Sequence, residues 1–264
     1  MTSSVVPVSP ETPVETSADA ALPAGPAAVR PFTEEAWDRI AGWRDAVDHM
    51  PFVRALADGS LPAESFAFYL AQDAAYLREY SRVLARAAQL APDPAAQGFL
   101  ARSSVSALEV ETALHRDWLG THAGLAAGEV ATVEPSPVTA AYTGHLHAAA
   151  SGSYAETVAA LLPCYWLYAH VGSVLVDLAR RRPGGLAAHP YAAWIGTYGD
   201  EGFQESTRQA RRLADDAARW VSPEERARML RAFEVSSVHE YLFFEQGTTC
   251  PTWPTPPVRA ETRG

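Results

Sequence analysis

The stretch that decides the fold is VAALLPCYWLYAHVGSVLV, at residues 158–176. It is apolar at nearly every position, and it is about long enough to cross a bilayer. However, Pro163, His170 and Ser173 interrupt it, and no basic residues flank its start. Because a helix that is apolar on all sides is buried somewhere, the stretch predicts the central helix of a globular core and not a membrane span.

The sequence on both sides of this stretch has the period of α-helices and shows no sustained strand-like alternation. The motif SPEE at 222–225 is a capping box with proline at the first helical position, which marks a helix start. The predicted helices cover residues 33–49, 62–90, 95–119, a short piece around 142–147, 152–180, 189–199, a surface helix ending near 220, and 222–246. We therefore predict an all-α fold, a bundle of helices with short connections.

Both ends of the chain differ in composition from this middle part. Residues 1–30 are rich in Pro, Ala, Ser, Thr and Val and do not resemble a signal peptide. Such a segment buries too little apolar surface to offset its ordering entropy. We expect a disordered extension at 1–30, a helical domain at 31–247, and a disordered Pro-rich tail at 248–264.

The charge and the cysteines restrict the partners and the compartment. Lys and Arg total 21 against 31 Asp and Glu, a formal net charge of -10, with no basic cluster. Nucleic acid is therefore not an expected partner. Cys164 and Cys250 cannot make a disulfide framework, so we expect a cytoplasmic protein.

Two carboxylates lie on the apolar stripes of predicted helices. Asp73 falls on the stripe of the helix at 62–90, and Glu240 falls on the stripe of the helix at 222–246. A buried carboxylate without a partner costs several kcal/mol. Each one therefore caps a helix, pairs with a buried base or takes part in chemistry, and the sequence leaves these readings open.

Cys164 lies on the inward stripe of the central helix, directly after Pro163. A lone buried cysteine is usually a small inert hydrophobic side chain. A proline inside a helix removes a hydrogen bond and kinks the backbone, which could open a pocket beside the sulfur. The spacing alone leaves both an inert and a nucleophilic cysteine possible.

A metal site is a further alternative. Glu111 and His115 are four residues apart on one predicted helix, and His145 and His147 follow on another. Carboxylates and histidines from several helices hold two irons in some bundles. No Glu-x-x-His pair occurs, however, and the His-x-His spacing does not put both rings on one helical face. We therefore expect no metal.

Six short motifs occur in order along the chain: AQDAAYL at 71–77, ALHR at 113–116, AYTGHL at 141–146, ALLPCYWLY at 160–168, WIGTYG at 194–199 and SSVHEY at 236–241. Together they resemble the motifs of the TenA/thiaminase II family, over roughly residues 32–246. The resemblance implies a heme-oxygenase-like helical bundle without heme or another cofactor, assembled as a homotetramer or homodimer. It also implies an aminopyrimidine aminohydrolase that converts 4-amino-5-aminomethyl-2-methylpyrimidine, and thiamin more weakly, to the hydroxymethyl form in thiamin salvage.

The resemblance also implies a role for each matching residue. Cys164 matches the nucleophile that adds to the pyrimidine ring, Glu240 the acid and base, and Asp73 the carboxylate that binds the amidine edge of the ring. The matching aromatic residues are Tyr76 in the pocket wall, Tyr142 and Tyr198 beside the thiol, and Tyr168 as a further pocket tyrosine.

Two departures from the family pattern and two rival functions remain. Asp200 replaces a glycine that is common after the WIGTYG motif, and residues 180–188 resemble an insertion. The rivals are a regulatory protein that binds a pyrimidine without turnover, and a metal-dependent oxidase on the same scaffold.

Overall fold

The computed structural model describes residues 30–110 and 133–255. The predictions for residues 1–29 and 256–264, the ALHR motif, Glu111 and His115 lie outside these ranges. The helices in chain order are α1 (Phe32–Arg39), α2 (Ala41–His49), α3 (Pro51–Asp58), α4 (Ala63–Leu90), α5 (Pro94–Val110), α8 (Pro137–Ala150), α9 (Tyr154–Arg180), the 3₁₀ turn η2 (Leu186–Ala188), α10 (Ala192–Gly199), α11 (Glu201–Ala218) and α12 (Pro223–Thr249).

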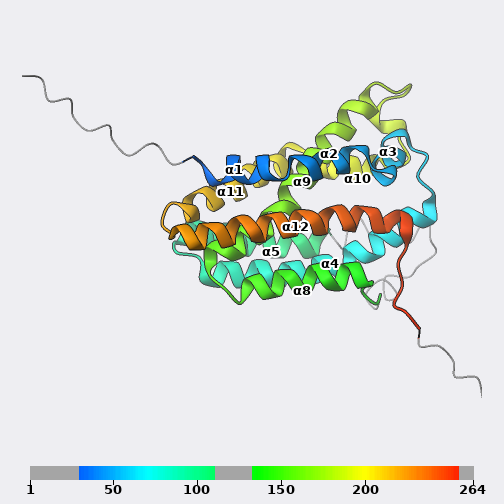
Figure 1. Ribbon diagram of the computed structural model, residues 1–264. Coiled ribbons are helices and arrows are strands. Elements are labelled where there is room, and N and C mark those ends of the chain that lie inside the picture. Colours follow the sequence, from blue (N-terminus) through cyan, green and yellow to red (C-terminus); the bar gives the residue numbers. More distant parts are fainter. Residues whose placement is uncertain (1–29, 111–132, 256–264) are drawn as a thin grey trace, which may run out of the picture. The chain divides into compact units, whose positions relative to one another are not determined.

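Helix α9 is the central helix of the bundle. It packs against α12, α11, α10, α8 and α4, and α12 runs along the bundle beside it (Figure 1). Helix α9 is also long and apolar enough to cross a membrane by length and composition, but 78% of its most apolar window is buried inside the protein. The prediction of a buried central helix is confirmed.

Side-chain caps begin several helices. Ser222 Oγ accepts a hydrogen bond from the Glu225 amide at 3.2 Å, which confirms the predicted start of α12. Asp200, the departure from the family pattern, accepts from the Gly202 amide at 2.7 Å and so caps α11. Asp200 therefore has a structural role at the junction of α10 and α11.

The helix predicted at 33–49 is wrong, because the chain breaks at Ile40. This residue is fully buried and separates α1 from α2. Helix α1 packs against α11 and α12, whereas α2 packs against α12 and α3. The two helices therefore share α12 but differ in their second neighbour, and the helical period of the sequence does not show the break.

Helix α3 was not predicted, although its boundaries have sequence signals. Pro51 is its first residue, and Gly59 ends it with a left-handed backbone, φ 73°. Proline is common at the first position of a helix, and glycine is common just after its last residue.

The end of the domain also differs from the prediction. The expected boundary at residue 247 falls inside α12, which continues to Thr249. Beyond it, Trp253 Nε1 donates a hydrogen bond to the Pro135 carbonyl at 2.9 Å. Residues 248–255 therefore include the last turn of α12 and a segment that contacts the bundle.

Candidate active site

A cavity of about 500 Å³ lies among five helices. Its lining residues are Asp73, Leu77, Tyr80 and Leu84 of α4; Phe99, Arg102, Ser103, Ser106 and Ala107 of α5; Cys164, Tyr165 and Tyr168 of α9; Thr197 and Tyr198 of α10; and Gly202, Phe203, Ser206 and Gln209 of α11. Its volume is in the range of small-molecule sites, about 300–1,000 Å³.

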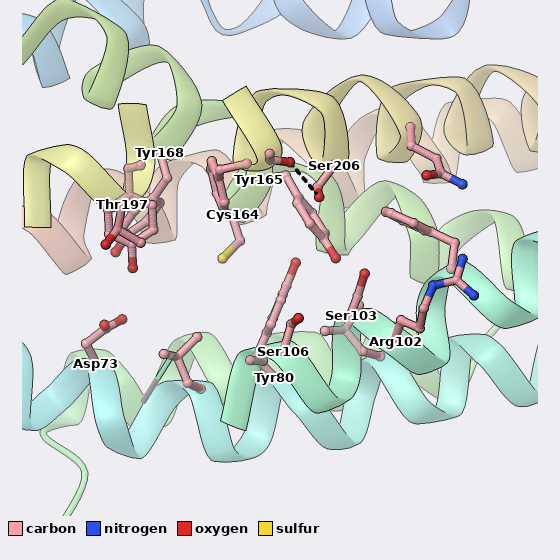
Figure 2. A pocket seen from close by; sticks show the side chains of 18 residues that line it. Asp73, Tyr80, Arg102, Ser103, Ser106, Cys164, Tyr165, Tyr168, Thr197 and Ser206 are labelled. Carbon is pink, nitrogen blue, oxygen red and sulfur yellow. Dashed lines mark hydrogen bonds between the residues drawn. The ribbon is translucent and has the colours of Figure 1, made fainter. Parts of the chain in front are cut away.

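The sulfur of Cys164 points into this cavity (Figure 2). The side chain is half-buried and packs against the hydrophobic core. Burial raises the pKa of the thiol above its usual value, and the carboxylates of Glu240 and Asp73 raise it further. The hydroxyls of Tyr76 and Tyr80 lower this pKa and so oppose the shift. At neutral pH the resting group is therefore the thiol, and a reaction through sulfur needs a partner that removes its proton.

Asp73 is 2% exposed and lines the same cavity from α4. Its neighbour Gln72 helps to fix this part of α4. Gln72 Oε1 accepts a hydrogen bond from the Ser136 amide at 2.8 Å, and Ser136 Oγ donates to Gln246 Oε1 at 2.7 Å. This buried network joins α4 to the start of α8 and the end of α12.

Glu240 is 1% exposed and does not line the cavity directly. The Tyr142 hydroxyl donates to its Oε1 at 2.5 Å. Burial raises the pKa of the Glu240 carboxyl to about 8 despite this hydrogen bond, and the charge of Asp73 adds to the shift. Glu240 interacts electrostatically with Cys164 and with Asp73. A carboxyl group that is mainly protonated at neutral pH is suited to donate a proton.

Aromatic side chains hold these groups in place. Tyr142 lies between Tyr76, with ring centroids 4.8 Å apart, and His239, at 5.2 Å. The hydroxyls of Tyr168 and Tyr69 share a 2.7 Å hydrogen bond. The hydroxyl of Tyr76 is buried and has no hydrogen-bond partner of normal geometry among the described residues. It nevertheless lowers the pKa of both the Cys164 thiol and the Tyr142 hydroxyl.

Two glycines set the position of Tyr198. A Cβ atom at Gly172 of α9 would lie 2.5 Å from the Tyr198 carbonyl carbon, and one at Gly199 would lie 2.3 Å from Val176 Cγ2. Only glycine lets the backbones of α9 and α10 approach so closely. The sequence analysis assigned no packing role to Gly172 or to Gly199, although Gly199 ends the WIGTYG motif.

The predicted site residues therefore gather in one region. Asp73, Cys164, Tyr168 and Tyr198 line the cavity, whereas Tyr76, Tyr142 and Glu240 are buried in its surroundings. The sequence analysis missed Tyr80, whose hydroxyl donates to the Leu161 carbonyl at 2.9 Å and also faces the thiol. Its place on the same helical stripe as Asp73 was the available signal.

The histidines considered as metal ligands have other partners. His145 Nε2 lies 2.9 Å from Ser236 Oγ, and His147 Nε2 lies 2.8 Å from Glu79 Oε2. Within residues 30–110 and 133–255, no three His, Cys, Asp or Glu side chains are grouped to hold a metal ion.

Residues 37–250 match the TENA/THI-4/PQQC family. The chain belongs to this family. It is 36% identical to an aminopyrimidine aminohydrolase of Bacillus subtilis over 81% of this chain and 88% of the relative. It is 39% identical to a thiamine biosynthesis multifunctional protein of Corynebacterium efficiens over 90% of this chain, but it spans only 30% of that protein's length.

Solved structures with the same fold include a TenA homologue. A TenA homologue from P. horikoshii OT3 superimposes with a TM-score of 0.73 at 27% identity, over 82% of this chain and 98% of the other. A protein with a heme oxygenase-like fold from Shewanella denitrificans superimposes with a TM-score of 0.64 at 13% identity, over 84% of this chain and 93% of the other. The predicted heme-oxygenase-like, all-α bundle is confirmed.

Proposed function

We propose that this protein is an aminopyrimidine aminohydrolase that converts 4-amino-5-aminomethyl-2-methylpyrimidine, and thiamin more slowly, to the hydroxymethylpyrimidine. The observation that carries the proposal is that the Cys164 sulfur points into a cavity that Asp73 also lines. The buried Glu240 interacts electrostatically with both residues. The identity to a relative named for this activity, over most of both chains, supports it.

The proposed reaction begins with addition of the Cys164 thiol across a ring C=N bond. Sulfur bonds to the ring carbon beside the one that carries the methylene, and Glu240 supplies a proton to the ring nitrogen. The proton of the thiol restores Glu240. Addition breaks aromaticity, so the electrons that the ring had delocalised become available to expel a group from the methylene.

The leaving amine departs as the electron pair of the ring nitrogen moves toward the methylene. The proton on that nitrogen passes through Glu240 to the amine, which leaves as ammonia, and an exocyclic alkylidene remains. Water then adds its hydroxyl to the alkylidene carbon and its proton to the ring nitrogen. The C–S bond then breaks, and the proton on the ring nitrogen passes to sulfur. This step regenerates the thiol and the aromatic ring, so the net reaction consumes one water.

The other residues would bind and orient the ring. Asp73 would accept hydrogen bonds from the amidine edge of the pyrimidine. Tyr168 and Tyr198 would form the wall on that side, and the Tyr76 hydroxyl would donate toward sulfur. Positioned acid–base groups of this kind contribute about 10²–10⁴ to rates.

The test is release of ammonia from the aminomethylpyrimidine by the purified protein. We expect turnover by the unmutated protein and none by Cys164→Ser, which should still bind the substrate in calorimetry. Absence of turnover by the unmutated protein, together with tight binding, would instead favour the regulatory protein. Iron found in protein purified without chelators would bring the oxidase forward.

Assembly and location complete the proposal. From the family resemblance we infer a homotetramer in the cytoplasm. Light scattering coupled to size-exclusion chromatography measures the mass of the assembly, and a monomer in solution would contradict the inference.

A further inference from the structure

The cavity extends well beyond the thiol. In Figure 2 the Cys164 sulfur lies between Asp73 and Tyr168 on one side and Arg102, Ser103 and Ser206 on the other. A pyrimidine with three small substituents is much smaller than the ligands that pockets of about 300–1,000 Å³ enclose. With its ring held between Asp73 and the sulfur, such a substrate leaves the opposite part of the cavity empty.

We call this opposite part the far end, and it consists of Arg102, Ser103, Ser106, Ser206 and Gln209. Asp73 and Arg102 are the two charged side chains among the described residues that line the cavity. Arg102 is exposed at the mouth, and it forms no ion pair or hydrogen bond with the part of the chain that the structure describes. One cation surrounded by neutral hydroxyl and amide groups is an environment for an anion.

The protein itself uses only some of the polar groups at the far end. Ser206 Oγ donates to the Gly202 carbonyl at 2.9 Å, and the Ser103 hydroxyl lowers the pKa of Tyr165. Ser106 and Gln209, like Arg102, make no hydrogen bond to the described residues. Within residues 30–110 and 133–255, nothing competes with a ligand for the polar groups of these three side chains.

The proposed chemistry directs the leaving group toward them. The thiol adds to the ring carbon next to the one that bears the methylene, while Asp73 holds the amidine edge. The methylene substituent therefore projects from the sulfur side of the ring, away from Asp73 and toward the far end.

Resting on the proposed function, we infer that the preferred substrates are 4-aminopyrimidines whose methylene carries an amine with an anionic tail. Arg102 would pair with the tail, and Ser106 and Gln209 would donate hydrogen bonds to it. The reaction stays a hydrolysis: water supplies the hydroxyl to the methylene and its proton to the departing secondary amine, which leaves as the primary amine bearing the tail.

The experiment compares four substrates that share one ring. They are the parent aminomethylpyrimidine, its N-carboxymethyl derivative, the matching neutral primary amide, and an N-phosphoethyl derivative. In the unmutated protein we expect kcat/KM for the carboxylate to exceed that for the amide about fivefold, the effect of a partly exposed charge pair. The phosphate derivative shows whether a phosphate tail is accepted as well as, or better than, a carboxylate.

Two variants test whether Arg102 causes the preference for the carboxylate over the amide. In Arg102→Gln the carboxylate-to-amide ratio should fall to about one, and in the unmutated protein high salt should shrink it. Arg54→Gln is the matched control, since Arg54 is an exposed arginine of α3 that does not line the cavity. It removes the same charge and should leave the ratio and the parent activity unchanged.

Three results distinguish failure of this inference from failure of the proposed function. An equal rate for carboxylate and amide in the unmutated protein, or an unchanged ratio in Arg102→Gln, would overturn this inference while the proposed function stands. Absence of turnover of all four compounds would overturn the proposed function. In that case the affinities of Cys164→Ser for the carboxylate and the amide still test the far end, because they depend on binding alone.

Discussion

The Tyr142 hydroxyl donates a 2.5 Å hydrogen bond to Glu240 Oε1, and yet the pKa of this carboxyl is raised to about 8. A donor favours the charged carboxylate, so by itself the bond lowers the pKa. Burial outweighs it, because little of the carboxylate's lost hydration is replaced. The hydrogen bond therefore holds the carboxyl in position, while burial keeps it protonated at neutral pH.

This relationship predicts how stability depends on pH. Glu240 titrates near 4.5 in the unfolded chain and near 8 in the folded protein, so between these values the folded state binds more protons. Its contribution is complete below about pH 4.5 and is lost as the pH rises through about 8. Glu240→Gln should flatten this part of the profile, whose slope is at most about 1.4 kcal/mol per pH unit.

Urea denaturation from pH 5 to pH 9 measures the profile for both proteins. Glu245→Gln is the control, because Glu245 lies on the same helix and is only half-buried. Parallel profiles for the unmutated protein and Glu240→Gln would mean that the folded carboxyl has an ordinary pKa.

Tyr76 is predicted to tune the reactivity of Cys164. Its hydroxyl lowers the pKa of the thiol and is buried without a hydrogen-bond partner of normal geometry among the described residues. Tyr76→Phe should therefore raise the thiol pKa further and slow alkylation by iodoacetamide at pH 8 about three- to tenfold, the effect of one hydrogen bond of about 0.5–1.5 kcal/mol.

The measurement uses a Cys250→Ser background, so that Cys164 is the one thiol that reacts. The rate is followed against pH in both proteins. A shift of the pH profile supports the electrostatic role, whereas an equal slowing at every pH would point to altered access to the sulfur.

The helical period of the sequence was sufficient to predict which polar side chains point inward. Asp73, Cys164 and Glu240 interrupt apolar stripes, and all three lie inside the protein, two of them on one cavity. The helical period gives this result without other data, because the apolar stripe of an amphipathic helix is its buried face. A polar residue on that stripe therefore points inward. The assignment of their roles came from motif resemblance and stays a prediction.

Features that depend on contacts between distant segments were not predictable. The break at Ile40 separates α1, which packs against α11, from α2, which packs against α3. The packing of Gly172 against Tyr198 joins residues of two helices, and neither helix's own pattern indicates which backbone approaches the other. The far end of the cavity is likewise assembled from α5 and α11, which are nearly a hundred residues apart.

The contact between Gly172 and Tyr198 gives the last prediction. A Cβ at residue 172 would lie 2.5 and 2.6 Å from the Tyr198 carbonyl carbon and oxygen. These are backbone atoms, which cannot swing aside as a flexible side chain would, so α10 must shift. Gly172→Ala should lower the free energy of unfolding by about 1–3 kcal/mol, the usual range for overpacking. Because Tyr198 lines the cavity, turnover should fall more than the loss of folded protein explains.

Gly196→Ala is the matched control on α10, two residues before Tyr198. A Cβ there meets nothing within 4 Å, and alanine in a helix interior is favoured over glycine by about 0.5–1 kcal/mol. This variant should therefore be at least as stable as the unmutated protein and equally active. Chemical denaturation and ammonia release under conditions where each variant is fully folded measure the two effects separately. A Gly172→Ala protein with unchanged turnover would show that the position of Tyr198 does not limit the reaction, even if stability falls as expected.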